Sequence, residues 1–333
     1  MSILNRFPVL RWRTALVGAE RSLRQAKQEL ADLRRRYEDP EARLTAEKQK
    51  RVRREGKLTR RRERRAAAAS RAAAADSSSA TVVSYPKSGR TWFAFLYYYY
   101  CLELLCERHL EHEFPIKPEL DTTFHQLLGE HPELPRAAFS HCGLAGKKSY
   151  HAVSTDPYQF LTKPTIFIAR DPRDVVVSHY YHLKYRNGLP AKDIDLEEFI
   201  CGELGVRRVV AFMNRWAPPI QHRHVNLWVL YYEDLRERTT ELAGKMLSFI
   251  GFAPINDAAL GPAVLASSFD RLKARERERR RRLGLETHDD SQRMRRGVGG
   301  GFRALPPDDV AYLNRIVSTL DPVFERYQLA SSD

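Results

Sequence analysis

Apolar and polar positions alternate along most of the chain in a way that predicts short buried strands followed by helices. Runs of β-branched and apolar residues begin at Thr81, Ala137, Thr165 and Asn226, and each has the length of a buried strand. Longer apolar or amphipathic segments between and after them predict helices over residues 91–109, 196–216, 239–250 and 310–327. Strands that alternate with helices indicate an α/β fold with a central parallel sheet.

The N-terminal part has a different pattern. From Leu16 to Tyr37 apolar or small residues recur at alternating spacings of three and four, at Leu16, Ala19, Leu23, Ala26, Leu30, Leu33 and Tyr37. This spacing predicts a coiled-coil helix over three heptads, so residues 16–37 are the candidate segment for self-association. Asp39-Pro40 ends the pattern, since proline cannot continue the helical hydrogen-bond ladder.

Composition separates this region from the rest. We expect a basic helical or coiled-coil extension over residues 1–75, a Ser-rich linker over 76–80 and a main domain over 81–333. The extension contains 22 of the 56 Lys and Arg but 9 of the 42 Asp and Glu, so it carries +13 of the net charge of +14.

The charge of the extension has two interpretations. It can keep a helical hairpin or an oligomerising coiled coil in solution, or Arg60 to Arg65 and their neighbours can bind an anionic partner such as lipid, nucleic acid or a polyanionic acceptor. The first is favoured, because no aromatic residues that could stack on bases are interleaved with the arginines.

Length and cysteine usage restrict the class of protein. A chain of 333 residues is long enough for one or two domains with a substantial core. Its four cysteines have neither disulfide-framework nor metal-ligand spacing, so we expect reduced thiols and no metal site. The sequence has no apolar stretch long enough for a signal peptide or a transmembrane helix, which leads us to expect a cytoplasmic protein.

The first strand leads into a loop suited to binding an anion. After Thr81-Val82-Val83 the chain places Lys87 and Ser88 just before the first turn of a buried helix, which also contains Thr91. Backbone N–H groups at the start of a helix, together with a lysine and hydroxyls, favour a phosphate. A Walker loop ends in Gly-Lys-Ser/Thr, whereas Lys87 lies two residues before Gly89, so a standard ATP or GTP loop is excluded.

Two other strands end in candidate functional residues. The strand from Thr165 ends at Arg170, and the following helix contains Ser178. Arg170 can pair with Asp171 or Asp174, or it can hold a phosphate with its planar guanidinium. His141 follows the strand that begins at Ala137, at the sheet edge where ligands of parallel sheets bind; it is either a structural residue or a catalytic base.

These stretches resemble one known family. The run Pro86-Lys87-Ser88-Gly89-Arg90-Thr91-Trp92 closely resembles the 5′-phosphosulfate loop of cytosolic-type sulfotransferases, which use 3′-phosphoadenosine 5′-phosphosulfate (PAPS) as sulfuryl donor. The common family form has Thr in place of Arg90, so this chain has an additional cation there. The stretch from Arg170 to Ser178 resembles the family motif that holds the 3′-phosphate, and the resemblance assigns that role to Arg170 and Ser178.

The resemblance extends to three further segments. By similarity, Tyr232 in the Tyr-Glu-Asp segment lies beside the adenine, and Phe269 together with Trp92 encloses the purine. Arg295, Arg296 and Gly297 resemble the start of the family's lid over the 3′-phosphate, where a flexible surface loop is the alternative.

The family implies a three-layer, P-loop-like α/β fold and transfer of a sulfuryl group from PAPS to an acceptor hydroxyl or amine on a small molecule or glycan. His141 is then the general base, and Lys87 with Ser88 stabilises the departing oxygen without a metal ion. Two other functions stay open from the sequence. One is a non-catalytic scaffold that binds a polyanion and retains a nucleotide-binding domain, and the other is a divergent ATP-dependent kinase.

Overall fold

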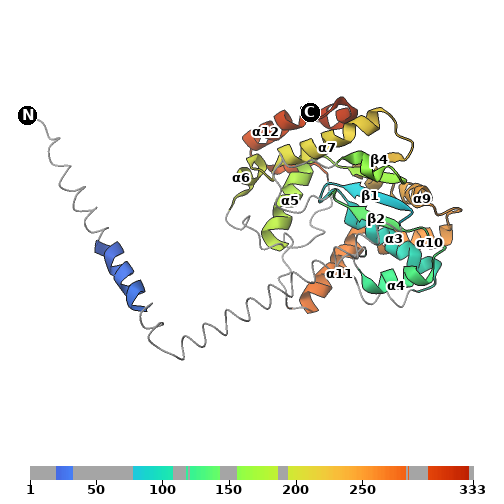
Figure 1. Cartoon of the computed structure of the whole chain (residues 1–333), viewed down its shortest axis with the longest axis horizontal. Coiled ribbons are helices and arrows are strands. Elements are labelled where there is room, and N and C mark those ends of the chain that lie inside the picture. The colour runs from blue at the N-terminus through green and yellow to red at the C-terminus, as the bar shows by residue number, and fades with distance from the viewer. Residues whose placement is uncertain are drawn as a thin grey trace, which may run out of the picture. The chain divides into compact units, whose positions relative to one another are not determined.

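The structure of the protein is a computed structural model. It describes residues 20–32, 78–107, 118, 121–142, 156–186, 194–282, 284 and 299–329. The chain divides into two units, Met1–Ala72 and Ala73–Asp333. In the first unit residues 20–32 form a helix, as the heptad pattern predicts (Figure 1). The rest of the predicted seam and Arg60 to Arg65 lie outside the described residues, and pairing of this helix with a second copy stays a prediction.

Four parallel strands form the sheet of the second unit, in the order β2-β1-β3-β4 (Figure 1). The strands are β1 (Ala80–Ser84), β2 (Ala137–Ser140), β3 (Thr165–Ala169) and β4 (Leu227–Tyr231). In register, Val83 of β1 lies opposite Ser140 of β2 and Phe167 of β3. The carboxyl ends of β1, β2 and β3 therefore meet at one edge, which is where the sequence places the candidate residues.

Helices cover both faces of this sheet. They are α3 (Arg90–Leu104), α4 (Thr122–Glu130), α5 (Pro172–Arg186), α6 (Leu196–Cys201), α7 (Val206–Gln221), α8 (Tyr232–Glu237), α9 (Thr239–Ile250), α10 (Asp257–Ala266), α11 (Phe269–Arg282), α12 (Pro307–Val317) and α13 (Glu325–Leu329). The described residues also include 3₁₀ turns: η5 (Pro157–Phe160) precedes β3, η8 (Gly301–Ala304) precedes α12, and η9 (Pro322–Phe324) precedes α13.

The period of two along each strand divides the interior into two cores. Val82 and Ile166 pack with α3, α9 and α10 on one face, whereas Val83 and Phe167 pack with α5, α7 and α12 on the other. Figure 1 shows these two groups of helices on either side of the sheet. The predicted three-layer α/β architecture with a central parallel sheet is confirmed.

Two predicted helices are broken, and the helix predicted over 91–109 is shorter than expected, since α3 ends at Leu104 and Cys106 has a positive φ of 58°. The segment 196–216 is broken between α6 and α7, because Gly205 approaches the carbonyl of Ile200 so closely that a side chain would collide with it. The C-terminal segment 310–327 is broken by Asp321 and Pro322, where Asp321 caps the 3₁₀ turn η9 before α13 begins. In both places a local turn overrides the helical periodicity.

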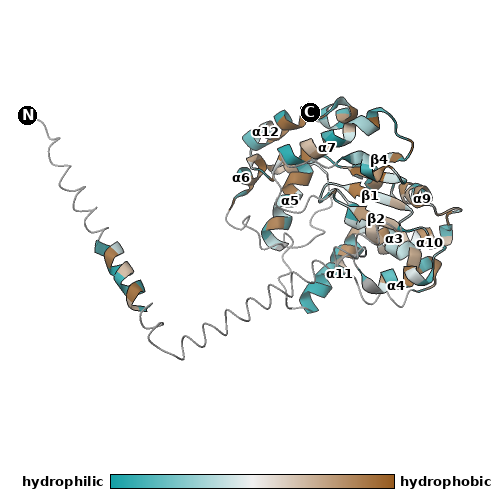
Figure 2. Cartoon of the chain, viewed as in Figure 1, coloured by the Kyte–Doolittle hydropathy of each residue, from teal (hydrophilic) through white to brown (hydrophobic). Residues whose placement is uncertain are grey.

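The consecutive tyrosines of α3 are all buried. Three of their hydroxyls form hydrogen bonds, two of them with the backbone: Tyr97 donates to the carbonyl of Pro135 (3.0 Å), and Tyr100 accepts from the backbone N–H of Asn256 (3.0 Å). The hydroxyl of Tyr99 accepts a hydrogen bond from Arg275 on α11 (2.5 Å). Figure 2 shows that most of α11 is hydrophilic, as its charged sequence predicts. Within the described part of the chain, no helix has the length and apolar character that crossing a membrane requires.

Candidate active site

The loop between β1 and α3 forms a tight turn in front of the helix. Lys87 has φ of +76° and Gly89 has φ of +102°, and the N–H of Ser88 donates to the carbonyl of Tyr85 (3.2 Å). The helix starts directly afterwards, since the N–H of Trp92 donates to the carbonyl of Gly89 (2.9 Å). Ser88 is buried, whereas Lys87 and Thr91 are half-buried. The turn thus leads directly into the N-terminus of α3, which is the kind of position that favours an anion.

Gly89 is the position where this loop meets the end of β4. An added Cβ would lie 2.6 Å from Cδ2 of Tyr232, closer than any real Cβ contact. Tyr232 also meets Trp92 edge to face, with ring centroids 5.9 Å apart. The glycine therefore serves two needs, a positive φ and close packing against an aromatic ring.

Arg170, which follows β3, contacts residues that follow β1 and β4. Its Nη1 donates to the carbonyl of Lys87 (2.9 Å), and its guanidinium carbon lies 4.3 Å from the centroid of the Tyr232 ring. Its Nε is buried and has no hydrogen-bond partner among the residues that the structure describes. The structure therefore brings Lys87, Arg170 and Tyr232 together, and it leaves one donor of Arg170 available for a ligand.

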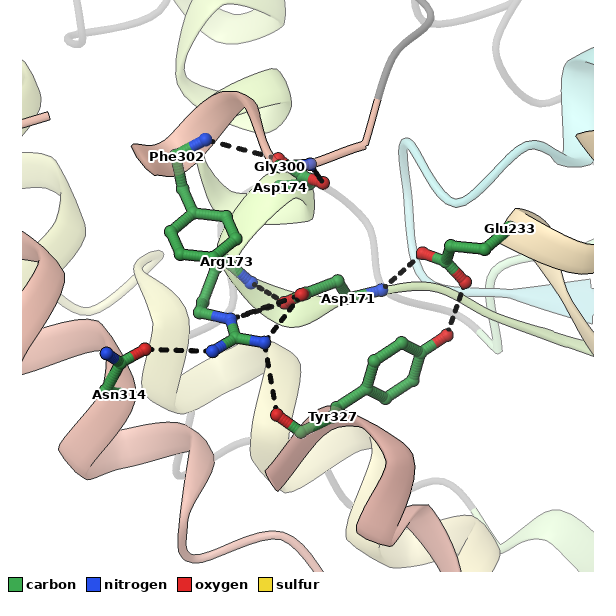
Figure 3. Close-up of polar contacts among 8 residues, drawn as sticks. All are labelled: Asp171, Arg173, Asp174, Glu233, Gly300, Phe302, Asn314 and Tyr327. Atoms are coloured by element: carbon green, nitrogen blue, oxygen red, sulfur yellow. Dashed lines mark hydrogen bonds and ion pairs between the residues drawn. The ribbon is translucent and has the colours of Figure 1, made fainter. Parts of the chain in front are cut away.

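The alternative in which Arg170 pairs with Asp171 does not occur. Asp171 instead forms a bidentate ion pair with Arg173, from Nε to Oδ1 (2.9 Å) and from Nη2 to Oδ2 (2.8 Å) (Figure 3). Asp174 is held by backbone donors, the N–H groups of Gly300 (2.7 Å) and Phe302 (3.3 Å). Burial raises the pKa of Asp174, and the nearby Arg170 cation opposes that rise.

Arg173 also anchors the C-terminal segment beneath the loop that follows β3. Figure 3 shows its Nη1 donating to Oδ1 of Asn314 on α12 (2.9 Å) and its Nη2 donating to the carbonyl of Tyr327 on α13 (3.1 Å). Glu233 completes the network, since it accepts from the N–H of Asp171 (3.1 Å) and from the hydroxyl of Tyr327 (2.8 Å). The network fixes the backbone on which Arg170 is mounted.

Burial dominates the electrostatics of this network. It raises the pKa of Glu233, although the N–H of Asp171 and the hydroxyl of Tyr327 partly offset the effect. Burial and the neighbouring Glu233 also raise the pKa of the Tyr327 hydroxyl well above its usual value. The hydroxyl therefore stays protonated and donates to Glu233.

His141 lies directly after β2 with a defined tautomer. Its Nδ1 lies 2.8 Å from the carbonyl oxygen of Ser84, the last residue of β1. A carbonyl can only accept, so Nδ1 carries the proton and the neutral ring has its lone pair on Nε2. This tautomer is the one that a general base needs.

The remaining predicted residues are placed less closely or lie outside the described residues. Arg90 is the first residue of α3 and is buried, and Ser178 is half-buried on α5. Phe269 is half-buried at the start of α11, and no ring contact joins it to Trp92 in the described ranges. The predicted lid residues Arg295, Arg296 and Gly297 lie outside the described residues.

Sequence reasoning did not predict how two carboxylates organise the site. The Asp174 carboxylate accepts a hydrogen bond from the N–H of Gly300 and so holds the segment before η8. Glu233, just after β4, accepts one from the N–H of Asp171 in the loop after β3. Both could have been recognised in the sequence as acidic residues that follow a strand and lie close to several cationic residues. Searched over the described part of the chain, His, Cys, Asp and Glu form no group of three that could hold a metal ion.

Comparison with known proteins gives a consistent result. A family model described as the sulfotransferase domain matches residues 78–320. Human sulfotransferase 2A1 is 24% identical over 237 residues, which cover 67% of this chain and 76% of that protein. Sulfotransferase 1A1 of Bos taurus is 28% identical over 242 residues, with the same two coverages of 67% and 76%.

Solved structures share the fold. Mouse sulfotransferase SULT7A1, complexed with PAP, matches with a TM-score of 0.50 at 18% identity, over 76% of this chain and 89% of that chain. Retinol dehydratase, in complex with androsterone and inactive cofactor PAP, matches with a TM-score of 0.50 at 18% identity, over 72% and 79% of the two chains. At this identity the likeness concerns the arrangement of the elements.

Proposed function

The chain belongs to the sulfotransferase family, and from this premise we propose that it moves a sulfuryl group from PAPS to an acceptor hydroxyl or amine on a small molecule or glycan. The observation that carries the proposal is the junction of Lys87, Arg170 and Tyr232 at one sheet edge. It brings together a lysine in the loop after β1, an arginine at the end of β3 and an aromatic residue at the end of β4. An adenosine with phosphates on both its 3′ and 5′ positions requires such a combination.

Two features of the structure fit a bound nucleotide. The buried Nε of Arg170 lacks a partner among the described residues, and a phosphate oxygen would satisfy it. The positive φ of Lys87 and Gly89 turns the backbone just before α3, where the N-terminus of the helix favours a phosphate. In this proposal Lys87, Ser88, Gly89, Arg90 and Thr91 hold the 5′ end, while Arg170 and Ser178 hold the 3′-phosphate.

The purine and the lid complete the proposed donor site. Trp92 and Phe269 would enclose the purine beside Tyr232, and Arg295, Arg296 and Gly297 would close over the 3′-phosphate. The donor supplies an activated sulfuryl group, and mouse sulfotransferase SULT7A1 and retinol dehydratase, both solved with PAP, agree with that choice.

His141 is proposed to remove the proton of the acceptor. Its Nδ1–H is held by the carbonyl of Ser84, which orients the ring and leaves Nε2 as the basic atom. Lys87 and Ser88 would stabilise the negative charge that develops on the departing bridging oxygen, which is usually the largest single contribution to catalysis. His141→Ala should lower kcat by about 10² to 10⁴ and leave nucleotide affinity unchanged; normal turnover would exclude His141 from the mechanism.

Calorimetric titration tests the donor site directly. Adenosine 3′,5′-bisphosphate, 5′-AMP and ATP are compared without magnesium, on the full chain and on a protein beginning at Asp76. Tight binding that requires the 3′-phosphate and survives truncation is expected. Arg170→Ala should weaken that binding by about 10- to 100-fold, because a hydrogen bond to a charged group contributes about 1.5–3 kcal/mol. Preference for ATP that strengthens when magnesium is added would favour a kinase, and absence of nucleotide binding would favour a scaffold.

The extension is proposed to mediate self-association through residues 16–37. Leu23 and Leu30, one heptad apart on the helix over residues 20–32, are 58% and 54% exposed, which suits an apolar seam that a second copy covers. Sedimentation should show an oligomer that Leu23→Glu with Leu30→Glu dissociates; a wild-type monomer would refute the seam. A polyanionic partner for the basic residues is the alternative, and it would be detected as salt-sensitive binding of heparin.

A further inference from the structure

Behind the phosphate loop lies a buried polar cluster that the proposed donor site does not use. It consists of Tyr85 in the loop after β1, His179 on α5 and Arg208 on α7, which are 2%, 3% and 1% exposed. Tyr85 lies two residues before Lys87, and His179 directly follows Ser178. The cluster is therefore connected to the donor site through adjacent residues on two elements.

The three groups share one small region. The rings of Tyr85 and His179 meet edge to face, with centroids 5.6 Å apart. Burial raises the pKa of Tyr85 to about 12 and lowers that of His179 to about 3, and the nearby Arg208 cation acts on both rings by lowering their pKa values. Lys87 acts on His179 in the same way, so the cluster adjoins the lysine proposed to contact the transferred group.

The polar atoms of this cluster are unsatisfied. Within the described part of the chain, the Tyr85 hydroxyl, Nδ1 of His179, and Nε and Nη2 of Arg208 are buried without a hydrogen-bond partner. Buried polar groups in proteins are almost always paired, and a buried cation especially so. Four unpaired atoms in one place therefore indicate a group that belongs there and is not part of the chain.

The free atoms of Arg208 specify the shape of that group. Nε and Nη2 form one edge of the guanidinium, with two parallel N–H donors. In Arg173 the same two atoms hold both carboxylate oxygens of Asp171. An equivalent planar or tetrahedral oxyanion would therefore satisfy Arg208, and the Tyr85 hydroxyl could donate a further bond to it.

The position of the cluster indicates which substrate carries the oxyanion. Trp92 and Tyr232, on the proposed purine side, pack in the core with α3. Tyr85 packs in the opposite core, with residues of α5 and α7. The cluster thus packs on the opposite face of the sheet from the proposed purine site, beside the loop that carries Lys87. An anion held there would not belong to the nucleoside, which leaves the acceptor.

We propose that Arg208, assisted by Tyr85, binds an anionic group on the acceptor, so that this enzyme sulfates hydroxyl compounds bearing a carboxylate, phosphate or sulfate. The proposal rests on the sulfotransferase function above and specifies its acceptor class. Burial, with the Arg208 and Lys87 cations, lowers the pKa of His179 to about 3, and its neutral ring packs against that of Tyr85. Binding of the anion compensates the buried charge of Arg208, which no residue of the described chain pairs.

A panel of matched acceptors tests the proposal. Phenols, alkyl alcohols and sugars, each with a carboxylate, a phosphate ester or a sulfate ester, are compared with neutral counterparts such as 4-hydroxybenzoate against its methyl ester. Binding is measured by calorimetry on the full chain saturated with adenosine 3′,5′-bisphosphate, and turnover is measured with PAPS. At least one charged member should bind at least tenfold more tightly than its neutral counterpart and show a correspondingly higher kcat/KM.

Two substitutions on the same helix separate charge recognition from general effects. Arg208→Met should reduce the ratio of charged to neutral affinity to about one, whereas Arg207→Met removes an exposed neighbouring cation and should keep the ratio. Arg208→Lys should retain part of the preference as a check on folding. Affinity for adenosine 3′,5′-bisphosphate should stay within threefold of wild type in all three proteins.

The outcomes distinguish this inference from the proposed function. Equal binding of charged and neutral members, no binding by any member, or the same preference in Arg208→Met would each overturn the anionic-acceptor site while nucleotide binding persists. Loss of nucleotide binding in the wild-type protein would instead overturn the sulfotransferase function on which the inference rests.

Discussion

Replacing Arg173 by Met would leave Asp171 as an unpaired carboxylate inside the domain. Arg173 is 0% exposed, and its guanidinium makes a bidentate pair with Asp171 and two further bonds, to Asn314 and to the carbonyl of Tyr327. Met has a similar length and can fill the space next to Phe302, whose ring centroid lies 4.5 Å from the guanidinium carbon. The substitution therefore removes the charge and the hydrogen bonds with little loss of packing.

Breaking a buried ion pair by removing one partner costs about 3–5 kcal/mol, because the other charge is left uncompensated. For a domain of this size each kcal/mol lowers Tm by about 2–4 °C, so Arg173→Met should lower Tm by about 6 to 20 °C. Differential scanning calorimetry of the full chain, with urea unfolding monitored by tryptophan fluorescence, would measure the effect. Since the network supports the backbone of Arg170, affinity for adenosine 3′,5′-bisphosphate should also fall.

Arg326 provides a matched control. It also makes a two-bond pair with an aspartate, Asp234, at 3.0 Å for both bonds, but the two side chains are 39% and 27% exposed. A pair in contact with solvent contributes about 0–1 kcal/mol, and the contact of the Arg326 guanidinium with Tyr231 adds about 0.5–1 kcal/mol. Arg326→Met should therefore lower Tm by much less than Arg173→Met.

The reasoning can be refuted in two ways. An Arg173→Met protein that loses no more stability than Arg326→Met would show that burial of the pair does not determine its effect. The double variant with Asp171→Asn removes the uncompensated charge but keeps a side chain that can cap α5, so it should recover part of the loss. If the double variant is less stable than Arg173→Met alone, an uncompensated carboxylate is not the cause.

Two further predictions concern the loop and the buried histidine. Gly89→Ala should weaken binding of adenosine 3′,5′-bisphosphate at least tenfold, because the added Cβ would displace Tyr232. Gly251 is the control, since it also has a positive φ but a Cβ there would have its nearest contact at 3.4 Å. Gly251→Ala should lower Tm and leave the affinity for this nucleotide unchanged. If calorimetry shows that Gly89→Ala binds adenosine 3′,5′-bisphosphate as tightly as the wild-type protein does, this prediction is refuted. Burial, with help from nearby cations, lowers the pKa of His179 to about 3, so between about pH 6.5 and 3 only the unfolded chain binds a proton at this ring. The free energy of unfolding should therefore fall by about 1.4 kcal/mol per pH unit on acidification across that window, and urea unfolding of His179→Phe at several pH values should show a shallower slope.

Local sequence was sufficient wherever a function depends on residue type and order within one segment. The turn that contains Lys87 and Gly89 could be predicted because a strand, a proline and a glycine in succession permit few backbone conformations. The parallel sheet followed from apolar runs separated by helices, since such crossovers place strands side by side in one direction. The convergence of Arg170 with Lys87 was predictable from those two facts, because carboxyl ends of parallel strands share one edge.

Partners distant in sequence were decided by the tertiary structure alone. Nothing near Asp171 indicates that it pairs with Arg173 and not with Arg170, since the choice depends on Asn314 and Tyr327, which arrive from the C-terminal segment. The break at Gly205 is likewise set by a close approach that periodicity does not register.

The buried cluster gives the clearest example of this limit. Nothing in the sequence relates the three members of the cluster. Tyr85 is one aromatic residue among many, Arg208 is one of many arginines, and no characteristic spacing connects them with His179. Packing of α7 against α5 buries them together with unpaired atoms, and burial is what converts an ordinary arginine into a candidate for anion recognition. The residue types in a segment determine what chemistry is possible, whereas packing determines which polar groups are left for a ligand to satisfy.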